Sequence, residues 1–159
     1  MKLTHTIIVM FVGSFMIQYL LMPAIMVNKR SDITNNLGKV YLSILMGLFM
    51  IGIEIMMHDH QYSIFSSKLY IALGLFILLF IYLYRKQVAI KDEQYLEGMI
   101  EHHSMGILTS ERILEKTNNY EVAKISKDII QKQKDEIRIM REINQKIKNH
   151  KKHKKQNFE

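Results

Sequence analysis

Three long apolar segments fill most of the first half of the chain, and they constrain its fold more than any other feature. They span about residues 6–27, 40–57 and 69–84, and the first holds 22 residues without a charged side chain. At about 1.5 Å per residue, a helix of that length crosses a hydrocarbon core of roughly 30 Å. The third is shorter, but Tyr70, Tyr82 and Tyr84 extend it with residues suited to membrane interfaces. Residues 1–87 are therefore predicted to form a membrane domain with three transmembrane helices.

A cleaved signal peptide is the alternative for the first segment. Lys2 alone would be its basic region, the apolar run is longer than such peptides need, and no cleavage site of small residues follows. We therefore interpret the segment as a retained span in which Pro23 kinks the helix near its end.

Three spans place the amino terminus and the second half of the chain on opposite sides of a membrane. Basic side chains close to the spans are counted to assign the sides. The side shared by the first loop and the second half carries Lys29, Arg30, Lys39, Arg85, Lys86 and Lys91. The other side has only Lys2 and Lys68. This charge rule favours a cytoplasmic second half.

The second half is predicted to be an antiparallel helical hairpin, which makes the fold class all-α. Asp92 is expected to cap a helix that ends near Lys116, and Asn118 and Asn119 separate it from a helix over about 121–148. Both helices carry one apolar stripe. Two helices bury little surface, so we expect residues 88–148 to form half of a four-helix bundle that a second copy completes, giving a homo-oligomer.

The formal charge of +7 is concentrated near the end of the chain. Residues 88–145 hold 9 basic and 11 acidic side chains, whereas residues 146–159 hold 6 and 1. That distribution is not the basic face of a specific nucleic-acid-binding domain. Residues 149–159 are expected to be a basic disordered tail that contacts anionic membrane lipids if it lies in the cytoplasm. The chain has no cysteine, which excludes disulfides and thiolate metal sites.

The segment Met-Ile-Glu-His-His, residues 99–103, holds the strongest chemical signal. Met99 lies three residues before His102 and four before His103, so a thioether and an imidazole share one helical face. Histidine and methionine without cysteine favour Cu(I), or Ag(I) as its chemical analogue. The alternative is that His103 is a hydrogen-bonded core histidine and Met99 fills the core.

The second helix of the hairpin places Gln133 on its apolar stripe, with Glu136 and Met140 nearby. A buried amide needs a partner, and a histidine on the facing helix is a natural one. Met140 could instead supply a second thioether to a metal. Metal coordination and a metal-free Gln–His hydrogen bond that sets the helix register both remain open.

Together these two blocks resemble the domain of unknown function 305 family, a ferritin-like group with the signature Met-x-x-His-His followed by Gln-x-x-Glu-Ile-x-x-Met. The match covers about Asp92 to Met140. Some members are exported copper- or silver-binding proteins, and some resemble this chain in carrying three membrane spans. The resemblance implies metal ligands at Met99, His102, His103, Gln133, Glu136 and Met140. Many relatives have proline at the position of Glu101, and the family's tendency toward export favours an extracytoplasmic hairpin, against the charge rule.

A second cluster, Met56-Met57-His58-Asp59-His60, ends the second apolar segment, with Glu54 on the same helical face as His58. It is either a metal entry point, since ionisable groups in spans are functional candidates, or an interfacial group of ordinary polar residues. Motifs of di-iron proteins, zinc proteases and P-loop enzymes are missing from the sequence, and we predict that the chain is not an enzyme.

The sequence therefore predicts a multi-pass protein of the cell membrane that binds copper, as Cu(I), in metal handling or tolerance. The second hypothesis is a structural or interaction protein whose His, Gln and Met side chains set the packing of the bundle. The third is a small oligomeric transporter built from the three spans with Glu54 in its path.

Overall fold

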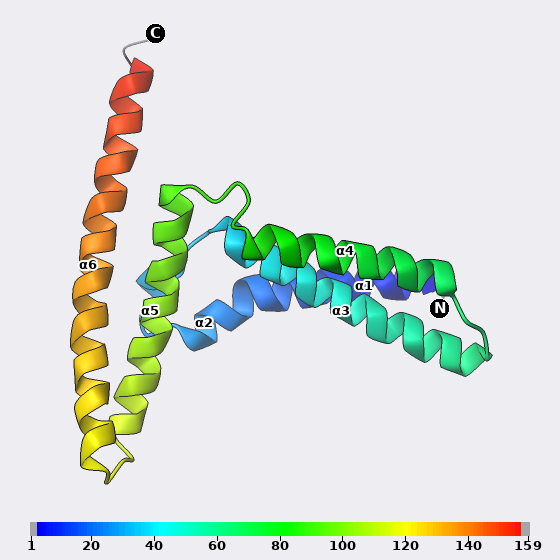
Figure 1. The fold of residues 1–159 in the computed structure, drawn as a ribbon, viewed down its shortest axis with the longest axis horizontal. Helices are drawn as coiled ribbons and strands as arrows, with labels where there is room; N and C mark the ends of the chain where they lie inside the picture. The colour runs from blue at the N-terminus through cyan, green and yellow to red at the C-terminus, as the bar shows by residue number, and fades with distance from the viewer. Residues whose placement is uncertain (1–2, 157–159) are drawn as a thin grey trace. The chain divides into compact units, whose positions relative to one another are not determined.

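The structure is a computed structural model that describes residues 3–156, and the described chain is all-helical, which confirms the predicted fold class (Figure 1). It divides into two compact units. The first holds the residues up to Met22 together with Leu37–Ala89, and the second holds Pro23–Asn36 together with the chain from Ile90 onward. The second unit therefore contains a segment that the sequence placed with the membrane domain.

Among residues 3–156, three helices are long and apolar enough to cross a membrane: Leu3–Met26, Leu37–Tyr62 and Ser67–Arg85. The predicted segments lie within or close to these helices. The first is not uniform, because α1 (Leu3–Met16) passes through a π-helical turn, η1 (Ile17–Leu21), into α2 (Met22–Met26). Pro23 has no N–H to donate to the carbonyl four residues earlier, at Tyr19, so the regular α-helical ladder is interrupted there.

Close packing in the first unit depends on a small residue of α3 (Leu37–Tyr62). A Cβ atom at Gly47 would lie 2.5 Å from the Phe11 ring of α1, so only glycine lets that ring approach the α3 backbone. Further along the unit, Tyr41 Oη donates a hydrogen bond of 2.8 Å to the Val88 carbonyl, and its ring meets Phe80 of α4 (Ser67–Arg85) edge-on.

The second unit is built on the predicted hairpin, formed by α5 (Asp92–Leu114) and α6 (Tyr120–Gln156), which lie side by side in Figure 1. Asn119 caps α6, because its Oδ1 accepts hydrogen bonds from the N–H groups of Glu121 and Val122. Asp92 is the first residue of α5 rather than its cap. Its charge still lies in the first turn, where the helix dipole favours a carboxylate.

Residues 149–156 are helical, and not disordered as predicted from their composition. They continue α6 without a break, because the preceding turns already supply its hydrogen-bonded template and extending a helix costs less than nucleating one. Lys151 also pairs with Glu93 near the start of α5. Residues 157–159 of the predicted tail lie outside the described residues.

The core of the hairpin is small. Ile100 and Ile107 of α5 pack with Ile137 of α6, and Ile130 and Met140 lie partly buried against them. Additional packing comes from the Pro23–Asn36 segment and its short 3-10 helix η2 (Arg30–Asp32), which belong to the same unit. This segment therefore supplies part of the cover for the hairpin; the expectation that a second copy completes the bundle stays a prediction.

Candidate functional site

His103 lies at one edge of the α5–α6 interface and contacts both helices. Its Nδ1 lies 2.7 Å from the Met99 carbonyl one turn earlier, and its Nε2 lies 2.8 Å from Glu136 Oε2 on α6. A carbonyl can only accept, so Nδ1 carries a proton and donates it. The Nε2 atom of the same ring faces the Glu136 carboxylate. His103 is 15 % exposed and Glu136 is 55 % exposed.

Gln133 of α6 lies one helical turn from Glu136, opposite Gly106 of α5. A Cβ atom at position 106 would come within 2.4 Å of Gln133 Oε1, so the glycine makes room for the amide. Among the described residues this Oε1 atom is buried without a hydrogen-bond partner. Buried polar atoms are rarely left unpaired, and an ion or a water molecule is one usual explanation.

The two methionines occupy the next turn in the same register. Because α5 and α6 are antiparallel, the pairing of Gly106 with Gln133 and of His103 with Glu136 places Met99 opposite Met140. Met99 is half-buried, and Met140 packs against the isoleucine core. Two thioethers, one imidazole, one carboxylate and one amide therefore occupy three successive turns along one edge of the hairpin. We call this set the His103 edge.

His102 is not part of this arrangement. It is exposed, and its ring centre lies 6.2 Å from that of His103 with the planes inclined by 72°. Within residues 3–156, no three His, Asp or Glu side chains converge in the geometry of a metal site. The His103 edge supplies only two donors of those types, so a metal there would depend on the thioethers and the amide.

The other side of α5 binds the Pro23–Asn36 segment through a buried carboxylate. Asp32 is 3 % exposed and accepts a 2.6 Å hydrogen bond from Ser104 Oγ, which is itself fully buried. Arg141 of α6 pairs with the same carboxylate. The Ser104 hydroxyl also accepts a 2.9 Å hydrogen bond from the Asn28 N–H. The hairpin thus holds this segment through contacts from both of its helices.

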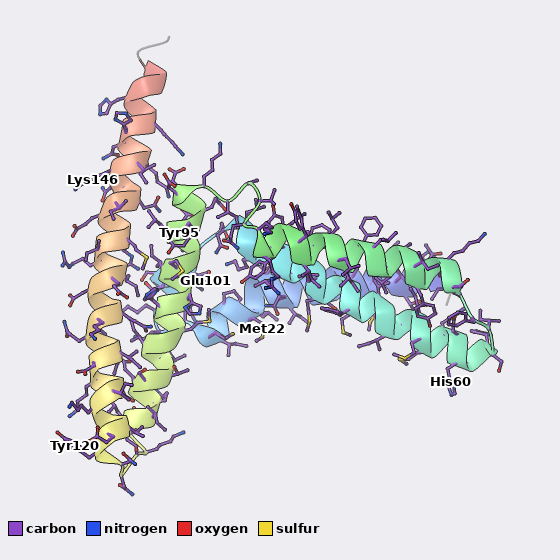
Figure 2. The ribbon with its side chains drawn as sticks, in the orientation of Figure 1. Met22, His60, Tyr95, Glu101, Tyr120 and Lys146 are labelled. Atoms are coloured by element: carbon purple, nitrogen blue, oxygen red, sulfur yellow. The ribbon has the colours of Figure 1, made fainter. Side chains whose placement is uncertain are left out.

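Glu101 holds the same segment two residues beyond Asp32. Its Oε2 accepts a 2.9 Å hydrogen bond from the Thr34 N–H, and Thr34 Oγ1 donates to the Glu97 carbonyl at 2.8 Å. Glu101 is buried and lies well inside α5, at the position where relatives were expected to have proline (Figure 2). In this chain the position fastens a loop and has no part in the His103 edge.

An open pocket of about 390 Å³ lies beside this segment, between Asn28 and the middle of α6. It presents cationic groups, but Arg141 is paired with Asp32, Arg138 with Glu142, and Lys134 with Glu111. The remaining lining residues are Lys29, Ile107, Ile137 and Gln145. Its positive charge is therefore largely neutralised by neighbouring carboxylates.

Comparison with known proteins assigns the hairpin to a family. Residues 83–157 match the family model described as "Domain of unknown function (DUF305)". The chain is also 35 % identical over 138 residues to "Uncharacterized protein L153" of Acanthamoeba polyphaga mimivirus, covering 86 % of this chain and 90 % of that protein. The chain belongs to the DUF305 family. No solved structure matches it.

An alignment of 138 residues is longer than the DUF305 match itself, so the likeness to the viral protein extends into the apolar helices. Within this DUF305 protein, His103 faces α6. Its partner there is Glu136, whereas the metal-free hypothesis had it bonded to Gln133.

Sequence reasoning missed the side chains of α5 that bind the Pro23–Asn36 segment. Glu101 and Ser104 lie three residues apart on α5 and so share a helical face, which in retrospect is a polar face that needs partners. Asp32 gave no signal, because a single aspartate in a loop is ordinary.

The Met56–His60 cluster does not converge on one point. Asp59 is buried and accepts hydrogen bonds from both the N–H and the hydroxyl of Ser66, at 2.6 and 2.8 Å, where α4 begins. His58 lies beside Asp59 and packs on Tyr62, while Met56, Met57 and His60 are exposed. The geometry gives Asp59 a structural role at the α3–α4 turn.

Proposed function

We propose that this DUF305 protein is anchored in a membrane and binds a soft monovalent cation, Cu(I) or Ag(I), at the His103 edge. The observation that carries the proposal is the alignment of His103–Glu136, Gln133 and the Met99–Met140 pair along one edge, with Gln133 Oε1 buried and unpaired among the described residues. Imidazole and thioether ligands are those that Cu(I) prefers.

The facing of an imidazole and a carboxylate supports a cation at this place. Glu136 faces His103 Nε2, and a bound cation would contact both groups. Met99 or Met140 would supply sulfur, and Gln133 Oε1 an additional oxygen. His102 is exposed, and we leave it out of the proposed ligand set. A role in metal handling would follow from binding of this kind.

Exposure of the apolar helices supports the membrane anchor. A long apolar face of α4 is open in the isolated chain, with Ile71 at 65 %, Leu75 at 64 % and Leu78 at 64 % exposed. Apolar surface of that extent is stable when lipid covers it. Packing of the Pro23–Asn36 segment within the hairpin unit also agrees with three spans, which put that loop and the second half on the same side.

The proposed side of the hairpin is the cytoplasm, on the basis of the six basic residues near the spans on that side. A reporter enzyme or fluorescent protein fused after the last residue, with a second fusion in the Ser63–Ser66 turn as the matched control, tests this. Activity of the cytoplasmic reporter only at the first position supports the assignment. The reverse pattern contradicts it.

The metal proposal is tested by titrating the full chain in detergent with Cu(I) and Ag(I). Replacing Met99 and Met140 with leucine, which preserves volume, should weaken binding at least about tenfold if one thioether coordinates the ion. H103N should do the same, and H102Q is the matched control that should leave affinity unchanged. Equal affinity of all variants would remove the site from the His103 edge.

The second candidate function is a structural one, favoured by the 2.8 Å pairing of His103 with Glu136. In that case the pair sets the register of α5 against α6, and no metal is involved. Replacing both residues with apolar side chains would then leave a folded hairpin, and the full chain would not bind Cu(I) in any variant.

A further inference from the structure

The α6 helix carries two parallel seams, of which only one packs on α5. The first seam faces α5, as the burial of Ser126, Ile137 and Asn144 indicates. Its positions follow spacings of three and four in alternation: 123, 126, 130, 133, 137, 140, 144 and 147. The adjacent positions show the same spacing: Val122, Ile125, Ile129, Lys132, Glu136, Ile139, Ile143 and Lys146. Alternation of three and four is the pattern of a coiled-coil interface. We call this second set the outer seam.

The outer seam remains largely open to solvent in the isolated chain. Exposed fractions are 58 % for Ile125, 45 % for Ile139 and 42 % for Ile143, and Ile129 is half-buried. The seam lies between the labelled Tyr120 and Lys146 in Figure 2 and is roughly 36 Å long. A row of isoleucines of this length on an otherwise charged helix requires a partner.

The order of residues in the seam indicates what that partner is. About a centre at residue 134, the seam is nearly symmetric: Lys132 mirrors Glu136, Ile129 mirrors Ile139, and Ile125 mirrors Ile143. Two α6 helices placed antiparallel across a twofold axis at that centre would bring each lysine opposite a glutamate and each isoleucine opposite an isoleucine. A parallel pair would place lysine against lysine and glutamate against glutamate. The charges therefore complement each other in the antiparallel arrangement alone.

We propose that two copies of this chain associate through the outer seams of antiparallel α6 helices, with Lys132 of each copy paired to Glu136 of the other. Among the described residues Lys132 has no ion-pair partner, and Glu136 has only His103. The Pro23–Asn36 segment does not obstruct the dimer. Its Asp32 and Thr34 bind Ser104 and Glu101 of α5. Those contacts lie on another face of the hairpin from the His103–Glu136 pair.

The dimer also completes the environment of the His103 edge. Glu136 belongs both to that edge and to the outer seam. Lys132 of the second copy would therefore be a second partner of this carboxylate, beside His103. The two α5–α6 hairpins together would form a four-helix bundle with α6 helices at its centre. This inference rests on the seam and stands whether or not a metal binds.

The chain has no cysteine, so disulfide cross-linking tests the arrangement directly. Full-length I129C and I139C chains are prepared separately in detergent with a metal chelator, then mixed and oxidised. The antiparallel register predicts a cross-linked dimer only in the mixture, joining position 129 of one copy to position 139 of the other. Each variant alone should remain uncross-linked, since its two cysteines would lie roughly 15 Å apart along the axis.

A cross-link in I129C alone would overturn the antiparallel register. If no cross-link forms and the measured mass is that of a monomer, the dimer proposal is wrong. The outer seam would then contact lipid or another protein. The chelator keeps this outcome separate from that of the metal proposal, because association is measured without any metal.

Charge reversal provides a second measurement. K132E should raise the dissociation constant about tenfold, because it replaces two attractive contacts by two repulsive ones. The double variant K132E/E136K restores opposite charges and should return the constant close to that of the unmodified chain. K124E, on an exposed position of α6 outside the seam, is the matched control and should have no effect. Equal constants for K132E and K124E would contradict the proposal.

Discussion

Ser104 Oγ donates a 2.6 Å hydrogen bond to Asp32 Oδ2, although 72 residues separate the two in the chain. The contact ties the segment between the first two apolar helices to the DUF305 hairpin. Both groups are buried, so each depends on the other for its hydrogen bond. The second unit of this protein is therefore assembled from two distant parts of the sequence.

Replacing Asp32 with alanine should destabilise the second unit by about 1–3 kcal/mol, because Ser104 and Arg141 lose their shared acceptor. Thermal unfolding of the full chain in detergent, followed by circular dichroism, measures the change. Proteolysis should also become faster between residues 27 and 36. S31A is the matched control, since Ser31 is exposed, its hydroxyl makes a 3.4 Å contact with Asp32, and the carbonyl that accepts a bond from Arg141 is kept in alanine. An equal, small effect of both variants would mean that the segment is not held by Asp32.

E101A should also destabilise the second unit, by about 1–2 kcal/mol, because it leaves the Thr34 N–H without its carboxylate acceptor. E111A removes a carboxylate from the same helix, but its ion pair with Lys134 is on the surface and its loss should cost less than about 0.5 kcal/mol. The unfolding free energies of the two variants are compared directly. If E111A is the more destabilising, Glu101 does not fasten the loop.

The G106A substitution should leave the stability of the hairpin nearly unchanged while it lowers Cu(I) affinity at the His103 edge. The added Cβ would displace only the end of the flexible Gln133 side chain, and alanine gains about 1 kcal/mol of helix propensity over glycine, so stability should change little. If Gln133 contributes an oxygen ligand, Cu(I) affinity should fall with the amide displaced. G98A is the matched control, because its Cβ would meet Asn36 at an ordinary 3.5 Å. Reduced affinity in G98A as well would point to a general change in the hairpin.

Alkaline pH should weaken the contact between α5 and α6 at the end of the hairpin away from the Asn119 turn, where Lys148 pairs with Glu97. A 2.8 Å hydrogen bond to Glu97 raises the pKa of Lys148 above its ordinary value of 10.5, mainly through that bond. A lysine whose pKa is higher in the folded state than in the unfolded state stabilises the fold. The contribution is fully present at pH values below the unfolded-state pKa, and it is lost as the pH rises through the folded-state pKa. Stability should thus fall above about pH 10.5, by a small amount because Lys148 is 55 % exposed.

Denaturant unfolding at two alkaline pH values, one on each side of the Lys148 transition, measures this loss. E97Q removes the carboxylate and should reduce the difference between the two. An unchanged difference in E97Q would assign the alkaline loss to other groups.

Hydrophobic pattern was sufficient to predict the three apolar helices, the hairpin and the turn at Asn119. These features depend on residues close together in the chain, where helical periodicity and capping act locally. The same local logic placed Met99 and His103 on one face of α5, and Gln133 near Glu136 and Met140 on α6, because helical periodicity fixes which residues share a face.

The sequence by itself therefore determined the helices and which of their residues share a face. Only the tertiary structure decided that Asp32 and Thr34 complete the second unit, that Glu136 rather than Gln133 pairs with His103, and that α6 continues to Gln156. The physical reason is that a loop contact or a side-chain pairing depends on which groups are brought together by packing. A single polar residue in a loop carries no periodic signal of the partner that it will meet.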